Sequence, residues 1–239
     1  PIDYPGLNFK SMRILLLDAG PRLLPNFSEK SSDEVKKVMA KMGVDVQLNA
    51  LVETYDGERL LFKDGSFIVA SNVYWVAGVR ANSITGLIPE SYNKANRLEV
   101  NEYNQVKGYS NIFALGDTAS MITEKYPKGH PQVVQPAIQQ ASNLAKNFSR
   151  LIKNKPLKAF KYKNLGSMAT IGRNNAIVEI GKIRFSGFLG WITWLFIHLV
   201  NILGVTNKLF VVIDCAWSYF TYDPSLRLII KPITKKRKV

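Results

Sequence analysis

Cysteine and histidine are scarce in this sequence of 239 residues. Its one cysteine, Cys215, excludes an intrachain disulfide and any Cys-x-x-Cys redox pair. The two histidines, His130 and His198, lie far apart in the chain, and neither belongs to a cluster of metal-ligand residues. We therefore expect no metal site.

Acidic residues are the second shortage. The chain has 18 Asp and Glu against 32 Lys and Arg, which gives a net charge of +14. The imbalance is strongest in residues 156–239, where 13 basic residues accompany only three acidic ones. Such a block favours an anionic partner, either lipid head groups or nucleic acid. Because 46% of the residues are hydrophobic, the chain can bury a core, and global disorder is excluded.

A glycine-rich phosphate loop is also missing, because no G-x-G-x-x-G follows any expected strand. The sequence nevertheless has the alternation of an α/β fold. Apolar runs at 11–20, 44–48 and 73–76 are typical of buried strands. A helix is expected over 33–42, capped by Ser31 or Ser32.

Two further segments predict small antiparallel units. Between residues 51 and 69, the pairs Asp56-Gly57 and Asp64-Gly65 are hairpin signals and indicate a three-stranded meander. Within residues 160–180, two short strands are expected on either side of the turn at 173–175.

The rest of the chain is organised around residues 111–141. A buried strand is expected at 112–115, followed by a Gly116-Asp117 turn, an irregular loop and a helix over 132–152. A strand that ends in Gly-Asp places a carboxylate where open α/β folds bind ligands. The start of the following helix offers unpaired N–H groups to an anion or a carbonyl.

Gln135 and Gln139 lie four residues apart on this helix. The spacing puts them on one face, so both amides can reach one planar ligand. The alternative is a surface helix whose glutamines are solvated. The Gly-Asp turn just upstream favours the ligand-binding interpretation.

Three segments together resemble the type II, non-proton-pumping NADH:quinone oxidoreductases. Residues 134–139, VQPAIQ, resemble the quinone-site motif A-Q-x-A-x-Q, with Val134 in place of the first alanine. Residues 18–25, DAGPRLLP, resemble the family segment E-A-G-P-R-L-L-P, with Asp in place of Glu. Residues 75–82, WVAGVRAN, resemble W-x-A-G-V-x-A-N.

This resemblance implies an α/β, partial two-dinucleotide-binding (Rossmann-like) flavoprotein that uses FAD and NADH. The FAD-binding residues would be Gly116, Asp117, Gln135 and Ala137, with Asp117 on the ribityl chain. The quinone-binding residues would be Gln135, Gln139, Trp194 and Ile197. The NADH-binding residues would be Asp18, Ala77, Gly78 and Val79. Without the resemblance, Asp18 would be an ordinary strand-end carboxylate and Gly78 a plain turn glycine.

The C-terminal third contains two long apolar segments. Residues 186–207 carry no charged side chain and could span a bilayer, but polar residues and glycines interrupt them. Residues 209–220 form a second apolar segment, rich in aromatics, and basic residues flank both. This pattern favours amphipathic helices that lie in one leaflet, and residues 220–229 resemble the family's C-terminal membrane domain. A dimer interface or a core helix pair is the alternative. The basic tail at 235–238 fits anionic lipid or a nuclear import signal.

We predict three parts: residues 1–85 from the NADH-binding domain, 86–155 from the FAD-binding domain, and 156–239 with flavin-covering strands and anchoring helices. The predicted function is FAD-mediated electron transfer from NADH to a membrane quinone. The enzyme would be peripheral, on the cytoplasmic face of a bacterial inner membrane. A homodimer is a further option for its assembly, and no nucleic-acid partner is expected. Because both phosphate loops lie outside these residues, the chain alone is expected to be inactive.

Two alternatives stay open. One is a non-catalytic, basic, membrane-associated fragment. The other is a different quinone-reducing flavoprotein of the same fold, such as a sulfide:quinone reductase. The lone Cys215 disfavours that reductase, because sulfide oxidation needs paired cysteines, and it excludes a disulfide reductase.

Overall fold

The structure, a computed structural model, describes residues 8, 12–201 and 204–221. Two compact units make up the chain: Pro1–Val52 with Gly166–Val239, which we call the split unit, and Glu53–Leu165, which we call the central unit. The helices and strands are β1 (Ile14–Leu17), α1 (Glu29–Lys41), β2 (Val44–Gln47), β3 (Val52–Tyr55), β4 (Arg59–Phe62), β5 (Phe67–Val69), η2 (Pro89–Ser91), β6 (Leu98–Val100), η3 (Gly116–Thr118), β7 (Ala119–Met121), α2 (Val134–Ile152), β8 (Ser167–Thr170), β9 (Ala176–Ile180), β10 (Ile183–Ser186), α3 (Gly187–Asn201) and α4 (Val205–Thr221).

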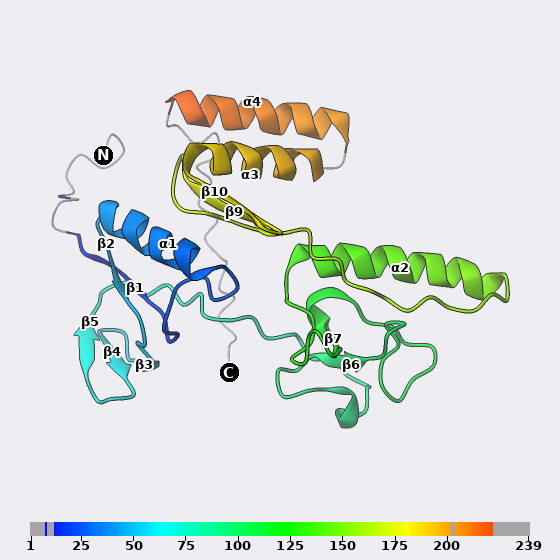
Figure 1. The fold of residues 1–239 in the computed structure, drawn as a ribbon. Helices are drawn as coiled ribbons and strands as arrows, with labels where there is room; N and C mark the ends of the chain where they lie inside the picture. The colour runs from blue at the N-terminus through cyan, green and yellow to red at the C-terminus, as the bar shows by residue number, and fades with distance from the viewer. Residues whose placement is uncertain (1–7, 9–11, 202–203, 222–239) are drawn as a thin grey trace, which may run out of the picture. The chain divides into compact units, whose positions relative to one another are not determined.

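The split unit begins with a β1–α1–β2 crossover (Figure 1). The two strands are parallel, with Ile14 opposite Val44 and Leu17 opposite Gln47. This confirms the two predicted strands. The prediction that they are buried is not met, because Ile14 is exposed and the other residues of both strands are only half-buried. The apolar side of α1 packs on the strands, with Val35 buried.

Helix α1 begins earlier than predicted. Its N-cap is Ser28, whose side chain accepts a hydrogen bond from the Ser31 amide. The prediction of a cap at Ser31 or Ser32 is wrong, since both serines lie inside the helix and are buried. A distant carboxylate explains the shift: Glu179 of β9 accepts hydrogen bonds from the Ser28 amide and from both hydroxyls, Ser28 and Ser31.

The C-terminal part of the split unit is a three-stranded antiparallel sheet in the order β10-β9-β8. The hairpin of β8 and β9 confirms the predicted pair, whereas β10 was not predicted. Ile171 and Ile177 from this region share a core with Leu23 and Val35. Helix α3 lies against β9, and a side chain at Gly190 would come within 2.4 Å of the Ala176 carbonyl oxygen.

Helices α3 and α4 lie alongside each other in Figure 1. No helix among the described residues has the length and hydropathy needed to cross a membrane. Many large apolar side chains on the pair are nonetheless exposed, among them Phe196 at 65% and Phe220 at 79%. The predicted family resemblance at 220–229 and the basic tail at 235–238 fall largely or wholly outside the described residues.

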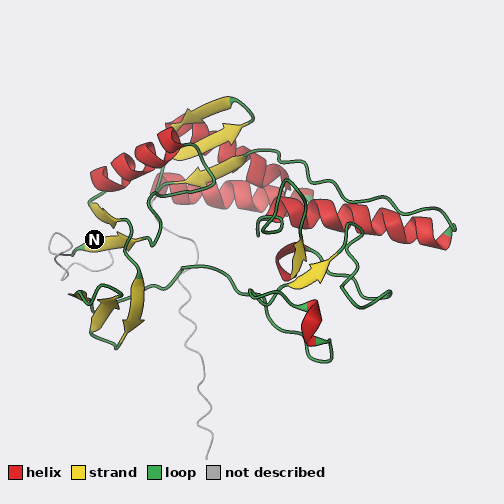
Figure 2. Cartoon of the chain, turned by 60° about the horizontal axis from the view of Figure 1, so that its bottom comes forward, coloured by secondary structure: helices red, strands yellow, loops and turns green. Residues whose placement is uncertain are grey.

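The central unit contains the predicted meander, in the strand order β3-β4-β5, with β4 and β5 antiparallel. A second pair, β6 and β7, is parallel, with Leu98 opposite Ala119. Leu98, Val106, Ala114 and Ala119 form the core behind this pair. Figure 2 shows α2 as a long helix, beside which the following loop runs back.

Two predicted strands of the central unit are wrong. Residues 73–76 form no strand, and Tyr74 is 88% exposed, because no described strand pairs with them. Residues 112–115 are extended but make only an isolated bridge at Phe113, and β7 follows the Gly-Asp turn instead of preceding it. Helix α2 starts at Val134, two residues later than predicted.

Candidate functional site

The Gly116-Asp117 turn packs on the first turns of α2. The Gly116 amide donates a hydrogen bond of 2.7 Å to the side-chain oxygen of Gln140, which is buried. Gly116 has a φ of +66°, and a Cβ added there would lie 3.1 Å from the Cβ of Ala137. The left-handed backbone and this close approach both require glycine. The structure therefore places the Gly116 end of the turn against Ala137. The assignment of Gly116, Asp117 and Ala137 to FAD stays a prediction.

Arg97 fixes the backbone on the other side of this turn. Its guanidinium donates to the carbonyl oxygen of Asp117 at 3.1 Å and to those of Ala119 and His130. Burial lowers the pKa of Arg97, and the charge of Asp117 opposes this shift. Gln132 adds a second donor to the Asp117 carbonyl at 3.3 Å. Asp117 is thus held by its main chain, while the residue is exposed.

An exposed carboxylate on a fixed turn is suited to accepting hydrogen bonds from a polyol. Ionised carboxylates accept from hydroxyls and have no donor of their own. Pro136, in the first turn of α2, has no N–H and removes one of the donors that a helix start leaves unsatisfied. The residues present fit the ribityl chain of FAD, with Asp117 as the acceptor.

Gln135 and Gln139 lie on one face of α2 and both contact the chain that follows the helix. The side chain of Gln139 donates to the Lys163 carbonyl at 2.8 Å and accepts from the Lys163 amide at 3.0 Å. The oxygen of Gln135 accepts from the Leu165 amide at 3.1 Å and from the Tyr162 hydroxyl at 3.4 Å. The solvated alternative is therefore wrong for both amides.

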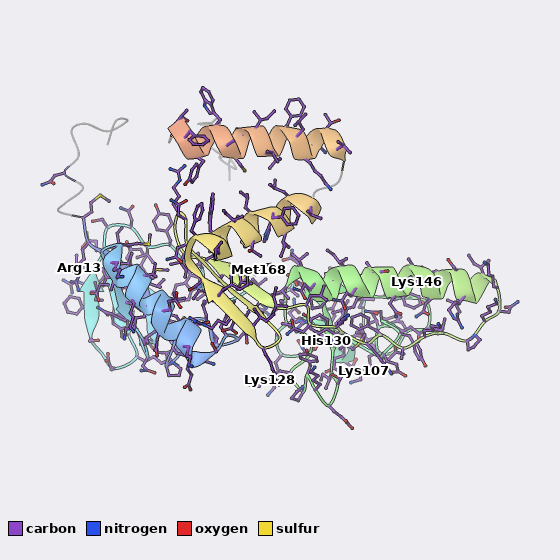
Figure 3. The ribbon with its side chains drawn as sticks, turned by 45° about the horizontal axis from the view of Figure 1, so that its top comes forward. Arg13, Lys107, Lys128, His130, Lys146 and Met168 are labelled. Carbon is purple, nitrogen blue, oxygen red and sulfur yellow. The ribbon has the colours of Figure 1, made fainter. Side chains whose placement is uncertain are left out.

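His130 lies in a cluster of aromatic rings next to this helix (Figure 3). Its ring centroid is 4.9 Å from Tyr126, 5.4 Å from Tyr162 and 5.5 Å from Phe160. Burial lowers the pKa of His130, and the charge of Arg97 lowers it further. Burial also raises the pKa of Tyr162, with a smaller contribution from Tyr126. Both rings are thereby favoured in their neutral forms.

The residues predicted to bind NADH lie in two places. Asp18 follows β1, and one of its carboxylate oxygens accepts a hydrogen bond of 2.7 Å from the Gly20 amide. Its backbone bonds to Gln47 and Ala50, so the turn after the strand is fixed. Ala77, Gly78 and Val79 lie in an irregular, exposed segment of the central unit, in which Gly78 has a φ of +78°.

Trp194 and Ile197, predicted to line the quinone path, lie on α3 of the split unit. The Trp194 ring packs on the His198 ring at 4.2 Å, and the His198 Nδ1 lies 2.7 Å from the Trp194 carbonyl oxygen. A cavity of about 490 Å³ lies between α3 and α4. Trp191, Trp194, Leu199, Cys215 and Tyr219 are among the residues that line it.

Comparison with known proteins assigns the family. Residues 7–141 match the pyridine nucleotide-disulphide oxidoreductase family, and residues 164–221 match the NDH2 C-terminal domain. The chain belongs to the pyridine nucleotide-disulphide oxidoreductase family. The predicted resemblance to type II NADH:quinone oxidoreductases is confirmed by the relatives that follow.

The type II NADH:quinone oxidoreductase NdhA of Mycobacterium tuberculosis is 35% identical over 210 residues, which are 82% of this chain and 43% of that protein. The type II enzyme of Haemophilus influenzae is 36% identical over 178 residues, 73% of this chain and 39% of that protein. The chain thus spans less than half the length of these relatives. The structure of NDH2 from Plasmodium falciparum in complex with NADH superposes with a TM-score of 0.79 at 18% identity, over 90% of this chain and 60% of that one. This likeness confirms the predicted α/β fold.

Two residues that hold the Gly-Asp turn were not predicted as site residues. They are Gln140 and Arg97. No local motif contains Arg97, which lies 20 residues before Asp117, so only the folded chain reveals their contact.

Proposed function

We propose that this chain is part of an NADH:quinone oxidoreductase that transfers two electrons from NADH through FAD to a membrane quinone. Flavin accepts a hydride from NADH and passes the electrons on, while protein residues bind and orient the partners. The observation that carries the proposal is the contact of the Gly116-Asp117 turn with α2, through the Gln140 hydrogen bond and the Ala137 side chain. It joins the predicted flavin segment to the predicted quinone helix.

We propose the following roles for residues of the central unit. Asp117 would accept hydrogen bonds from the ribityl hydroxyls, and Gly116 would let the chain pass close to α2. Ala137 would border the flavin ring. Gln135 would present its amide to the quinone, and Gln139, on the same face of α2, would support the quinone site. Trp194 and Ile197 of α3 remain separate proposed quinone contacts.

For NADH we propose two contacts. Asp18, at the end of β1, would accept hydrogen bonds from the ribose hydroxyls, which disfavours a 2′-phosphate and selects NADH over NADPH. Ala77, Gly78 and Val79 would lie along the nicotinamide, because a glycine lets a flat ring approach the backbone. The three predicted parts, 1–85, 86–155 and 156–239, remain our proposal for the division among NADH-binding, FAD-binding and C-terminal regions.

We also propose a peripheral position on an anionic membrane. The exposed apolar side chains of α3 and α4 support it, since so large an apolar surface is unusual for a face in water. The cytoplasmic face of a bacterial inner membrane would suit the basic C-terminal third. Arg184, one of the predicted basic flanks, instead pairs with Glu34. A homodimer through the same helices is the alternative use of this surface.

Asp117→Ala tests the flavin assignment in the purified protein that carries this chain. A hydrogen bond to a charged group contributes about 1.5–3 kcal/mol, so we expect flavin affinity to fall about tenfold or more. Flavin content after gel filtration, read from the visible absorbance, measures the loss. Asp64→Ala, a turn carboxylate bonded to Ser66, is the control and should keep the wild-type content. An equal flavin content in Asp117→Ala and Asp64→Ala would show that Asp117 does not bind the flavin.

A further inference from the structure

Helix α2 carries an amide side chain at every fourth position along one side. These residues, which we call the amide ladder, are Gln135, Gln139, Asn143 and Asn147. After the helix, residues 155–165 form neither helix nor strand and run back alongside α2 (Figures 1 and 2). We call these residues the strap.

Each ladder amide bonds the backbone of the strap. Asn147 repeats the two-bond contact of Gln139: its amide donates to the Lys158 carbonyl at 2.9 Å and accepts from the Lys158 amide at 2.9 Å. Asn143 donates to the same carbonyl at 3.2 Å. Asn147 is buried, so its bonds are shielded from water. The side chains of one helix face therefore hydrogen-bond the backbone of the strap, as the backbone of a neighbouring strand does in a sheet.

The spacing of the two partners explains why the contacts repeat. Four residues of helix rise about 6 Å, and two residues of extended chain span about 6.6 Å. Gln139 and Gln135 therefore meet Lys163 and Leu165, which are two residues apart. From Lys163 to Lys158 the strap is longer than the matching helix, and there the Phe160 amide turns to bond the Glu102 carbonyl at 2.8 Å.

We propose that Gln139 is a positioning residue, which acts on the quinone site through the strap. Its amide oxygen and nitrogen both bond Lys163. The strap in turn presents the Tyr162 hydroxyl and the Leu165 amide to the oxygen of Gln135, and so sets the direction of that amide. Asn147 belongs to the same device, although it lies twelve residues along the helix from Gln135. The contact between the ladder and the strap is independent of the proposed function, and only its kinetic consequence rests on that function.

Hydrogen exchange in the purified protein tests the contact itself. Gln139→Leu removes the acceptor of the Lys163 amide, so we expect that amide to exchange about five to ten times faster. Asn147→Leu should do the same at Lys158. The control is Lys146→Ala, since Lys146 is exposed on the same helix (Figure 3). Unchanged exchange at Lys163 in Gln139→Leu would overturn the proposal.

Steady-state and stopped-flow kinetics of the flavin-containing protein test the consequence. We expect the quinone KM to rise about three- to tenfold in both Gln139→Leu and Asn147→Leu, with flavin reduction by NADH at the wild-type rate. If Gln139 contacts quinone directly and the strap is irrelevant, Asn147→Leu keeps the wild-type KM, and the proposal fails.

A charge variant separates positioning from a loss of folding. Gln139→Glu keeps the acceptor for the Lys163 amide but, when ionised, loses the donor to the Lys163 carbonyl. Protonation restores that donor, so the raised KM should return toward the wild-type value between about pH 6 and about pH 4, the range around the ordinary glutamate pKa of about 4.3. A raised KM that does not depend on pH contradicts the proposal. If the wild type reduces no quinone, the proposed function fails, and hydrogen exchange alone decides whether the ladder holds the strap.

Discussion

Gly116 is the residue of the site that tolerates substitution least. Its positive φ disfavours any other side chain, and the Ala137 Cβ fills the space that a Cβ would need. The amide of the same residue bonds buried Gln140. The exposed carboxylate of Asp117 is therefore presented from a backbone that is fixed on both sides, by α2 and by Arg97.

His130 gives the molecule a pH-dependent stability at the residue scale. Burial, aided by the charge of Arg97, holds the pKa of His130 below that of an unfolded histidine, which is about 6.5. Below this pH the unfolded chain binds more protons than the folded one, so stability falls as the pH is lowered from about 7. His130→Phe keeps a ring among Tyr126, Phe160 and Tyr162. It should remove this part of the slope of stability against pH.

Urea midpoints at about pH 7.5 and about pH 5.5 measure the effect. The chain has only one other histidine, His198, which His130→Phe leaves in place. Hydrogen bonds from Ser28 and Ser31 lower the pKa of Glu179, although burial opposes this shift. The contribution of Glu179 to stability is therefore lost only below about pH 4.5, outside the range measured here. A slope that persists in His130→Phe would contradict the assignment.

Local patterns predicted the residues of the site better than their contacts. Gly116, Asp117, Gln135 and Gln139 could be selected because a turn signal and a four-residue spacing are local features. Arg97 could not, since its partners are carbonyl groups that any residue supplies. Ser28 caps α1 through a local hydrogen bond from the Ser31 amide, but Ser31 and Ser32 carry the same local signal. Glu179, which bonds Ser28 and Ser31 from about 150 residues away, could not be predicted from that stretch.

At the element scale, the strands that were predicted correctly have a partner close in sequence. β1 and β2 are joined by one helix, and β3, β4 and β5 by short turns. Residues 73–76 are equally apolar but form no strand, because a strand needs a neighbour to bond its backbone. The NADH-binding assignment of Ala77, Gly78 and Val79 therefore remains a prediction.

The helix pair α3 and α4 carries the membrane prediction. We expect the purified protein to float with vesicles that contain anionic phosphatidylglycerol, and much less with neutral vesicles. Phe196→Glu should reduce flotation, since removing one large buried side chain from lipid costs about 1.5–3 kcal/mol. Val69→Glu, at an exposed apolar position on β5, is the control and should float as the wild type does.

Three outcomes would count against this prediction. Equal flotation of Phe196→Glu and the wild type would show that α3 does not enter the lipid. Binding to duplex DNA without any flotation would favour the nucleic-acid alternative for the basic C-terminal third. A dimer that dissociates in Phe196→Glu would favour the homodimer use of the surface.

At the scale of the whole molecule, the family match and the candidate site both support the proposed flavoprotein function. The family covers residues 7–141, which include the Gly-Asp turn and both glutamines, and the NDH2 C-terminal domain covers all of α3 and α4. The lone cysteine separates this chain from disulfide reductases of the same fold. The charge of +14 adds an attraction to anionic surfaces.

Stopped-flow absorbance on the purified, flavin-containing protein tests the central claim most directly. We predict that NADH bleaches the flavin absorbance and that a soluble short-chain quinone then restores it, with NADPH much slower than NADH. A flavin that NADH does not bleach, or one that stays reduced when quinone is added without oxygen, would contradict the proposed function.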